Sequence, residues 1–384
     1  MSDVRAPVSD AAASALLRER GSAFLVKRDH LPEWSWRDAA PPADLADGQV
    51  VLRQLRFALT ANNITYAKFG GDTQIQYWRF FPADDPWGQI PVWGIGEVAR
   101  SRHPALAEGE RVYGYFPMAS HLVVAPDRVR TAGFIDAQPH RAVLPPTYNE
   151  YARLDHDRSY DPARADQHLV LRPLFSLSFF LAAYLQDEAL FGARQIVISS
   201  ASSKTAMGLA FLMARDKPDG VRLVGLTSKG NAAFVARAGH YDDVISYDAI
   251  AALPTDAKAV FIDIAGDPKV LAAVHRHLGD IIQQSIRVGA THWDSTAAEE
   301  RLPGPAPQWF FTPDHIVRRR TEWGTDLLRT RLAQAWGAFV DDTDRWLRIS
   351  HGAGRPAIEA AYSQVLAGGV PAQVAHTLSF AGAA

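Results

Sequence analysis

From about Gln195 onward, the chain alternates short apolar stretches with polar loops and amphipathic stretches. The apolar stretches are continuous and rich in Val and Ile, as expected of strands buried on both faces of a parallel sheet. The intervening stretches have the apolar spacing of helices. This alternation predicts an α/β fold with a Rossmann-type, doubly wound parallel sheet and helices on both faces. The five predicted strands lie in "QIVISS", "VRLVGLTS", "DDVISYD", "KAVFIDIAG" and "SIRVGATHW".

The earlier part of the chain has a different pattern. From residue 50 to about 124, short β-rich runs such as "IPVWGIGEVARS" and "ERVYGYF" are interrupted by Gly and Pro. Several strands at this spacing predict a small barrel or sandwich. An apolar helix is predicted in "LFSLSFFLAAYLQDEALFG", and a long helix in "GTDLLRTRLAQAWGAFVDDTDRWLRI". A chain of 384 residues with these two patterns is expected to form two domains.

Composition narrows the kinds of partner. The net charge is −2, from 40 basic and 42 acidic residues, so no strong field attracts nucleic acid or a membrane surface. We therefore expect a small-molecule partner or another protein. The chain has no cysteine, which excludes disulfides, thiolate nucleophiles and cysteine-containing zinc sites. No signal-peptide run or membrane-spanning stretch is found in the sequence, and we expect a cytoplasmic protein.

The loop after the first predicted strand, "SASSKTA", has the chemistry of a phosphate site without its glycines. Hydroxyls, a lysine cation and the free amides of a helix N-terminus all bind phosphate oxygens. Ala206 stands where the third glycine of a dinucleotide-binding loop is expected, and alanine is accepted there. The alternative is that these residues only cap the helix, because Ser and Thr are favoured N-caps. The predicted cofactor-binding residues of this loop are Ser200, Ser202, Ser203, Lys204 and Thr205.

The loop after the second predicted strand, "GLTSKGN", begins where the ribose of a dinucleotide would be recognised. A carboxylate at this place selects the free 2′-hydroxyl of NAD, whereas hydroxyls with a cation suit a 2′-phosphate. This loop has no Asp or Glu, so the sequence predicts NADP(H) rather than NAD(H). The alternative is a surface lysine in an ordinary turn. The predicted cofactor-binding residues here are Thr227, Ser228, Lys229 and Asn231.

The order of these segments resembles the medium-chain dehydrogenase/reductase superfamily, in particular its zinc-free quinone oxidoreductase and enoyl reductase branch. The segments "FALTANNITYAKFGG", "YWRFFPA", "PVWGIGEV", "GERVYGYFPMASHL", "TYNEY" and "VGATHW" are similar to an uncharacterised domain-of-unknown-function group at the edge of that superfamily. The resemblance implies a β-rich GroES-like domain at 1–165 and 320–384, and a Rossmann-type NADP-binding domain at 166–319. It also implies a homodimer.

The same resemblance assigns further cofactor residues. "TANNITYAKFGG" is similar to the segment beneath the nicotinamide, with Asn62 or Asn63 in the asparagine position. Segments that match the third, fourth and fifth strands of the cofactor domain add further residues, which are Tyr247, Gly266, Gly289 and Thr291. The superfamily's glycine loop is replaced by "SASSKTA", and the cysteine that binds catalytic zinc in alcohol dehydrogenases has no counterpart.

Without a metal, reduction needs side chains that stabilise a developing oxyanion and supply a proton. Tyr66 is the first candidate, because enoyl reductases of this branch place a tyrosine in the matching segment, and Asn63 and His292 are the others. Two of these have an alternative: Tyr66 as a barrel core residue, and His292 as a structural histidine. The predicted substrate-pocket residues are Tyr148, Asn149 and Trp293, of which the first two are also suited to interface packing.

Together these features predict an NADPH-dependent, zinc-independent reductase of an activated C=C bond, with an enone, quinone or enoyl substrate, acting in an interdomain cleft. One alternative is a metal-free carbonyl reductase or alcohol dehydrogenase. Another is a non-catalytic binding protein whose cofactor site has degenerated, as the missing glycines would allow. The aromatic residues between 77 and 93 suggest an apolar or aromatic substrate.

Overall fold

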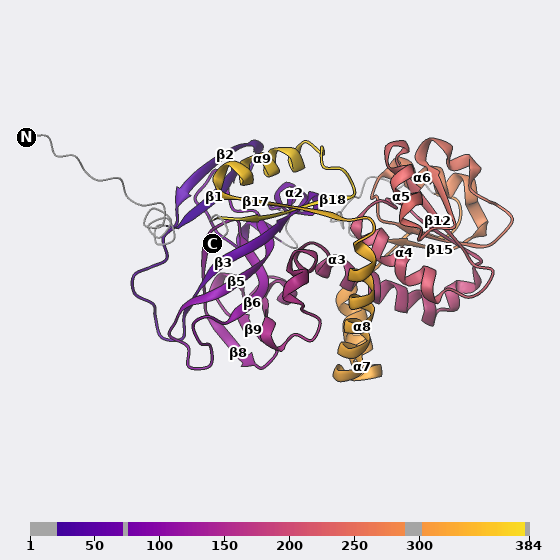
Figure 1. The fold of residues 1–384 in the computed structure, drawn as a ribbon. Coiled ribbons are helices and arrows are strands. Elements are labelled where there is room, and N and C mark those ends of the chain that lie inside the picture. The colour runs from indigo at the N-terminus through magenta and orange to yellow at the C-terminus, as the bar shows by residue number, and fades with distance from the viewer. Residues whose placement is uncertain (1–20, 72–75, 289–301, 381–384) are drawn as a thin grey trace, which may run out of the picture. The chain divides into compact units, whose positions relative to one another are not determined.

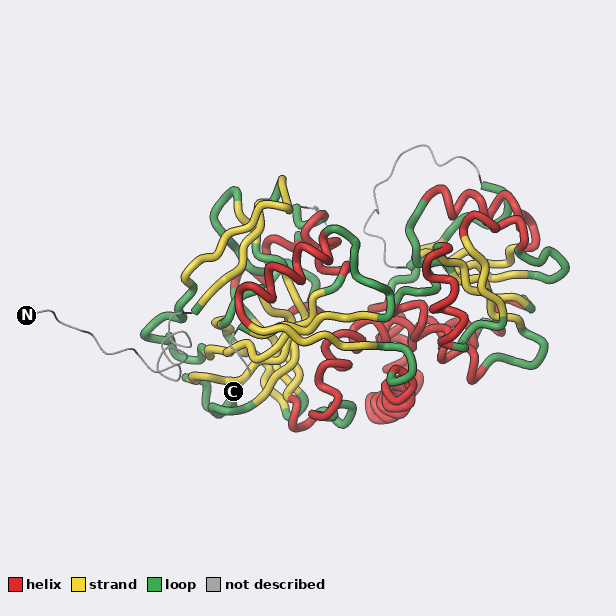
Figure 2. Tube along the Cα trace, turned by 45° about the horizontal axis from the view of Figure 1, so that its top comes forward, coloured by secondary structure: helices red, strands yellow, loops and turns green. Residues whose placement is uncertain are grey.

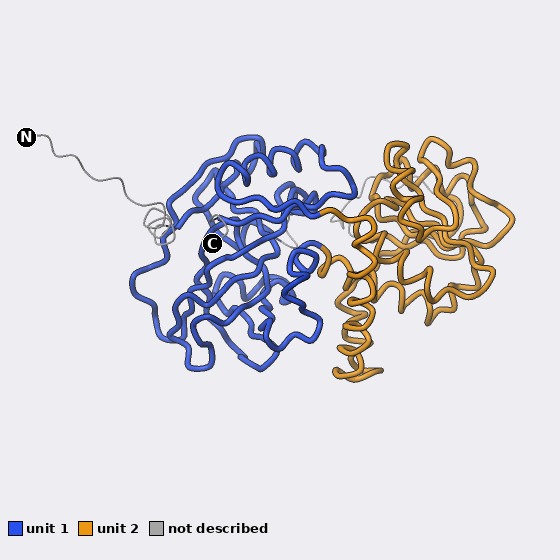
Figure 3. The backbone as a smooth tube through the Cα atoms, in the orientation of Figure 1, with its two compact units in different colours: residues 1–170, 349–384 blue, residues 171–348 orange. Residues whose placement is uncertain are grey.

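A computed structural model describes residues 21–71, 76–288 and 302–380. The chain divides into two compact units, shown in Figure 3. Unit 1 comprises residues 1–170 and 349–384, and unit 2 comprises residues 171–348. The first crossing between them falls within helix α3 (Ala165–Asp187), and the second falls at the start of strand β17 (Arg348–Ala353).

Unit 1 is built from antiparallel sheets. Among the described residues, a larger sheet runs in the order β17-β18-β3-β5-β6-β10-β9-β8, with β7 paired to β3, and a smaller sheet runs β2-β1-β4 (Figure 1). Its strands, besides β17, are β1 (Ser22–Lys27), β2 (His30–Asp38), β3 (Val50–Leu59), β4 (Trp87–Gly88), β5 (Pro91–Ser101), β6 (Arg111–Pro117), β7 (His121–Val124), β8 (Pro126–Arg130), β9 (Gly133–Asp136), β10 (Glu150–Arg153) and β18 (Val374–Ser379).

The core of unit 1 forms where β3, β5 and β6 face helix α9 (Gly354–Leu366) and strand β1. Phe24, Leu52 and Phe116 are fully buried there, together with Tyr362 of α9. Gly96 of β5 is required by this packing, because a Cβ atom at that position would lie 2.7 Å from the Phe116 ring. The C-terminal segment therefore completes the core of the N-terminal part of the chain.

Unit 2 is a six-stranded parallel sheet within the described residues, in the order β13-β12-β11-β14-β15-β16. This is the order of a doubly wound fold, and its switch point lies between β11 and β14. Figure 2 shows helices on both sides of these strands. The predicted fold class is confirmed. The strands are β11 (Gln195–Ile198), β12 (Arg222–Thr227), β13 (Asp243–Ser246), β14 (Ala259–Asp263), β15 (Ile282–Arg287) and β16 (Gln308–Trp309).

The helices of unit 2 pack their apolar faces onto this sheet and onto each other. The helical stretch Pro162–Asp187, which contains α3, is long and apolar enough to cross a membrane, but 67% of its most apolar window is buried inside the protein. Phe175 of α3 stacks on Phe339 of α8 (Thr325–Thr343), with ring centroids 4.8 Å apart, which identifies α3 as a core helix. The remaining helices are α4 (Lys204–Asp216), α5 (Lys229–Ala238), α6 (Pro268–Leu278), α7 (Thr312–Trp323) and α8 (Thr325–Thr343).

The boundary between the units differs from the sequence interpretation, which ended the cofactor domain at residue 319. The contacts keep α8 in unit 2, because Phe339 packs against Phe175 and Phe211. His240 Nε2 also lies 2.8 Å from Asp342 Oδ2, and little of either side chain is exposed. These contacts link segments far apart in the sequence, so helical periodicity alone could not assign α8 to a unit.

Candidate functional site

The carboxyl edge of the sheet in unit 2 gathers the polar loop residues predicted from the sequence. The loop after β11 leads into α4, and the loop after β12 leads into α5. Ligands of doubly wound sheets bind at this edge, beside the switch point. The two loops meet through Ser202, whose Oγ accepts hydrogen bonds from Thr227 Oγ1 at 3.3 Å and from Asn231 Nδ2 at 3.1 Å. The structure therefore brings the two predicted loops together.

The loop after β11 is held in place by two side chains. Ser200 has a φ of +52°, in the left-handed region, and its N–H donates to the Tyr247 hydroxyl at 2.8 Å. Ser203 is the N-cap of α4 and accepts a hydrogen bond from the Ala206 N–H at 3.2 Å. Ser200 therefore adopts without a glycine the backbone conformation that usually requires one. Several amides of this stretch are hydrogen-bonded within the chain, namely those of Ser200, Ala201, Ser203 and Ala206.

The next two residues differ in burial. Lys204 is half-buried at the first position of α4, and burial lowers the pKa of its ammonium group to about 8. Thr205 is buried, and its carbonyl accepts a hydrogen bond from Ser178 Oγ at 2.8 Å. A cation held at a desolvated helix N-terminus is stabilised by an anion placed beside it.

The loop after β12 is more exposed. Thr227 is buried at the end of the strand, whereas Ser228 and Lys229 are exposed. Ser228 is the N-cap of α5 but makes no side-chain capping bond. Residues 227–231 include no carboxylate. The second loop therefore presents hydroxyls, an amide and an ammonium group at the start of a helix.

Asp263, at the end of β14, was not singled out in the sequence. Its Oδ1 accepts hydrogen bonds from Ser199 Oγ at 2.8 Å and from the Gly266 N–H at 3.1 Å. Burial raises its pKa, and these hydrogen bonds oppose that shift. Gly266 has a φ of +64° and is exposed beside it. A carboxylate at the end of a buried strand is the signal that could have identified this residue.

In unit 1, the segment predicted to lie beneath a nicotinamide forms helix α2 (Ala61–Lys68). Asn62 and Tyr66 lie one turn apart, and Asn62 Nδ2 donates to the Tyr66 hydroxyl at 2.7 Å. Asn63 is buried, where its Oδ1 accepts from the Thr60 N–H at 2.7 Å and its Nδ2 donates to the Pro91 carbonyl at 2.9 Å. The structure thus directs Asn62 toward Tyr66 and gives Asn63 a structural role at the helix start.

Tyr66 belongs to a cluster of aromatic rings, called here the tyrosine cluster. The Tyr66 and Tyr77 ring centroids are 4.5 Å apart, and the Tyr115 and Tyr148 centroids are 4.8 Å apart. Burial raises the pKa of Tyr66 well above its ordinary value, and the proximity of Tyr148 raises it further. Its hydroxyl therefore stays protonated and acts as a donor. The tyrosine cluster consists of Tyr66, Tyr77, Phe80, Trp93, Tyr115 and Tyr148.

The remaining predicted site residues lie in different parts of the structure. Tyr148 lies in the tyrosine cluster, where its hydroxyl is 3.4 Å from that of Tyr77. Asn149 is buried, and its Nδ2 donates to the Arg141 carbonyl at 3.1 Å, so it holds the main chain rather than facing Tyr66. Four predicted residues lie outside the described residues, namely Gly289, Thr291, His292 and Trp293. Within the described part of the chain, no three His, Asp or Glu side chains gather as metal ligands.

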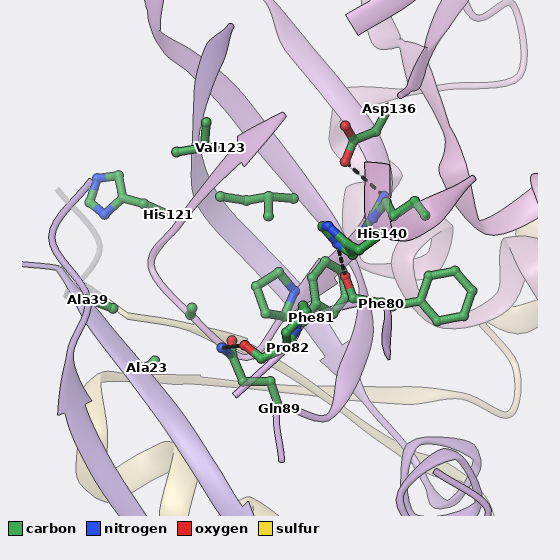
Figure 4. Close-up of a pocket in the computed structure, with 14 residues that line it drawn as sticks. Ala23, Ala39, Phe80, Phe81, Pro82, Gln89, His121, Val123, Asp136 and His140 are labelled. Atoms are coloured by element: carbon green, nitrogen blue, oxygen red, sulfur yellow. Dashed lines mark hydrogen bonds and ion pairs between the residues drawn. The ribbon is translucent and has the colours of Figure 1, made fainter. Parts of the chain in front are cut away.

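A cavity of about 210 Å³ opens in unit 1, and no predicted site residue lines it. It shares Phe80 and Phe81 with the aromatic cluster around Tyr115. Figure 4 shows His140 bonded to the Phe80 carbonyl, at 3.2 Å, and Asp136 in an ion pair, which it makes with Arg141 at 3.1 Å. These lining groups are engaged within the protein, and we assign the cavity no ligand.

Comparisons with known proteins extend these observations. Crystal structures similar to the chain include CurA from Vibrio vulnificus in complex with NADPH, at 13% identity and a TM-score of 0.58, covering 94% of this chain and 100% of that one. The YhdH oxidoreductase from Salmonella enterica in complex with NADP has 15% identity and a TM-score of 0.52, covering 93% and 99%. A mutant enoyl thioester reductase from Candida tropicalis has 11% identity and a TM-score of 0.52, covering 93% and 99%.

At these identities the likeness shows a common fold, the Rossmann-type and GroES-like units of medium-chain dehydrogenases/reductases. A search of curated proteins found no match. A family model described as "Protein of unknown function (DUF2855)" matches residues 57–371, which is most of the chain. The chain therefore belongs to the DUF2855 family, and it has the fold of the medium-chain dehydrogenases/reductases.

Proposed function

We propose that this protein is an NADP(H)-dependent, zinc-independent reductase of an activated C=C bond. In this proposal unit 2 binds NADP(H) and unit 1 binds the substrate. The observation that carries it is the loop after β12, where Thr227, Lys229 and Asn231 stand without a carboxylate. Hydroxyls and a cation at this place suit the 2′-phosphate that distinguishes NADP from NAD.

The residues at the carboxyl edge fit such a cofactor in three respects. Ser202 Oγ accepts two hydrogen bonds, so its own O–H is left to donate to a phosphate oxygen. The ammonium group of Lys204 lies at the start of α4, where the helix dipole also favours an anion. Asp263 Oδ2 is buried and has no hydrogen-bond partner among the described residues, and a sugar hydroxyl would supply one.

When bound, NADPH supplies a hydride. The chain's own residues would bind and orient the cofactor and the substrate. Lys204 and Ser202 would hold the pyrophosphate, and Lys229 would pair with the 2′-phosphate. Among the substrate-side residues, Tyr66 keeps its proton because burial raises its pKa, so it serves as a hydrogen-bond donor to a carbonyl oxygen.

The proteins with similar structures support this proposal. CurA was crystallised with NADPH and YhdH with NADP, and the Candida tropicalis protein is an enoyl thioester reductase. The sequence supports zinc independence, since the zinc-binding cysteine of the alcohol dehydrogenases has no counterpart in a chain without cysteine. A homodimeric assembly, implied by the family resemblance, and a cytoplasmic location, expected from the sequence, remain predictions.

Two alternative functions are compatible with particular observations. A donor such as Tyr66 beside a substrate oxygen would also serve a carbonyl reductase or alcohol dehydrogenase. A non-catalytic binding protein is favoured by the engagement of loop amides within the chain, namely those of Ser200, Ala201, Ser203 and Ala206. Cofactor titration separates this last possibility from both enzymes.

The experiment is a titration of the purified protein with NADPH and with NADH, followed by nicotinamide fluorescence. NADPH should bind more tightly than NADH. Lys229→Ala should weaken NADPH by about fivefold to tenfold, the effect of one exposed ion pair, and should leave NADH unchanged. Lys258, exposed directly before β14 and so at the opposite edge of the sheet, provides the control Lys258→Ala, which should change neither.

No change in nicotinamide fluorescence with either nucleotide would reject the reductase and favour the non-catalytic protein. Equal weakening of NADPH and NADH by Lys229→Ala would reject the assignment of Lys229 to the 2′-phosphate. If NADPH binds, oxidation of NADPH by an enone, compared with oxidation by the matching saturated ketone, distinguishes C=C reduction from C=O reduction.

A further inference from the structure

The tyrosine cluster contains buried hydrogen-bond donors without acceptors. Tyr115 is fully buried, and its hydroxyl has no hydrogen-bond partner among the described residues. The indole N–H of Trp93 is also buried and has no partner there. The two rings are in contact, with centroids 5.2 Å apart. Because nearly all buried polar groups in proteins are hydrogen-bonded, two such donors in one cluster require an explanation.

Tyr66 adds a third donor at the same place. Its oxygen accepts the hydrogen bond from Asn62 Nδ2 at 2.7 Å, so its own O–H is directed to another acceptor. The Tyr66 and Tyr115 ring centroids are 5.9 Å apart, so Tyr115 contacts both Tyr66 and Trp93. Burial raises the pKa of Tyr115, and the proximity of Tyr66 raises it further. The ring contacts therefore place the three donors in one cluster.

The tyrosine cluster is held in place, and the carboxylate near it is already paired. The main-chain carbonyl of Tyr115 accepts the Tyr151 hydroxyl at 2.5 Å, which holds β6 in position. The Arg141 guanidinium is near enough to favour negative charge at Tyr115. Asp136, the nearby carboxylate, is paired with Arg141 at 3.1 Å. Donors grouped in such surroundings suit an oxygen atom that carries or develops negative charge.

We propose that Tyr66, Tyr115 and Trp93 together form the binding site for the carbonyl oxygen of a planar conjugated carbonyl compound, an enone or a quinone. The inference rests on the proposed reductase function and names its substrate class. The flat rings of Tyr77 and Tyr148 border the donors and provide surfaces for stacking a conjugated system. Trp93 and Tyr115 thus become substrate-binding residues.

The test uses the full-length protein without cofactor and a coloured probe, 4-(dimethylamino)cinnamaldehyde. Hydrogen bonds to the aldehyde oxygen of this conjugated probe move its visible absorption band to longer wavelength. The band should shift on binding to the unaltered protein. Tyr66→Phe, Tyr115→Phe and Trp93→Phe should each reduce the shift and raise the dissociation constant of the probe by about tenfold, the usual value of one such hydrogen bond.

A matched control separates binding from folding. Tyr362 is a fully buried tyrosine of unit 1 whose hydroxyl donates to the Leu31 carbonyl at 2.7 Å, outside the tyrosine cluster. Tyr362→Phe should lower the thermal midpoint and leave the probe spectrum unchanged. Tyr115→Phe should change the probe spectrum without lowering the thermal midpoint, because it removes a hydroxyl that has no partner among the described residues.

Absence of a band shift with the unaltered protein overturns the proposal. So does a full shift in Tyr115→Phe together with a lowered thermal midpoint, since that pair of results means that the hydroxyl serves the fold. Binding of NADPH by Tyr115→Phe at the affinity of the unaltered protein shows that the cofactor site is intact, so failure of this inference is distinguishable from failure of the proposed function.

Discussion

At the scale of single residues, neighbouring side chains have different roles. Asn62 and Asn63 were equally suited, by sequence, to an asparagine position beneath a cofactor. The helix directs one of them to the Tyr66 hydroxyl and the other to Thr60 and Pro91. A one-residue step rotates a helical side chain by about 100°, so only the contacts around α2 decide between them.

Lys204 leads to a prediction about pH. Burial lowers its pKa to about 8, so in the free protein the cation is present below pH 8 and is lost above it. A bound phosphate favours the charged form and raises that pKa. NADPH affinity should therefore be highest below pH 8 and should fall by up to about tenfold per pH unit just above it, as measured by fluorescence titration from pH 6.5 to 9.5.

Lys204→Met supplies the comparison. This variant should bind NADPH more weakly than the unaltered protein at pH 7, and its NADPH affinity should not fall above pH 8. An equal fall in NADPH affinity above pH 8 in Lys204→Met would mean that another group causes the pH dependence. In the absence of cofactor, the stability of the fold depends on pH in the opposite direction to the NADPH affinity. The unfolded chain binds the Lys204 proton more tightly than the folded chain does. The contribution of Lys204 to stability therefore rises between pH 8 and 10.5.

At the scale of elements, the start of α2 is held by Asn63. Its amide bonds the Thr60 N–H and the Pro91 carbonyl, and so joins the helix to β5. Asn63→Ala removes both partners and leaves buried polar groups unpaired. The free energy of unfolding should fall by about 1–3 kcal/mol, as measured by urea denaturation.

Asn62→Ala is the matched change, one residue away. Asn62 is half-buried and makes the bond to Tyr66, so its loss should cost about 1 kcal/mol or less. The reverse order of these two effects would contradict the structural role of Asn63. If Asn63 acts only on the fold, any loss of activity in Asn63→Ala should be proportional to the loss of folded protein.

At the scale of the whole molecule, each unit has its own core, and the proposal gives the cofactor to unit 2. NADPH should therefore stabilise unit 2 by mass action, by about 2.7 kcal/mol at a concentration of one hundred times Kd. Hydrogen exchange followed by mass spectrometry should show slower exchange at the carboxyl ends of β11 and β12 and in the first turns of α4 and α5. Protection confined to unit 1 would place the nucleotide elsewhere.

Much of the architecture could be predicted because it is encoded locally. The strands from β11 to β15 follow continuous apolar runs, and α4 directly follows the polar loop after β11. Helix α2 was not predicted, because "TANNITYAK" has no apolar face of helical spacing. Its formation depends on the hydrogen bonds of Asn63 to residues near and far in the chain.

The sequence by itself determined the doubly wound sheet, the two polar loops at its carboxyl edge and the absence of a carboxylate in the second loop, because periodicity and residue type act within short stretches. Only the tertiary structure decided that Ser202 joins the two loops, that Asn62 rather than Asn63 meets Tyr66, and that α8 belongs to unit 2. It also decided that Trp93 and Tyr115 lie in the cluster around Tyr66 as donors that have no acceptor among the described residues. Those features arise from contacts between residues distant in sequence, whose partners are chosen by packing and by the need of buried polar groups for hydrogen bonds.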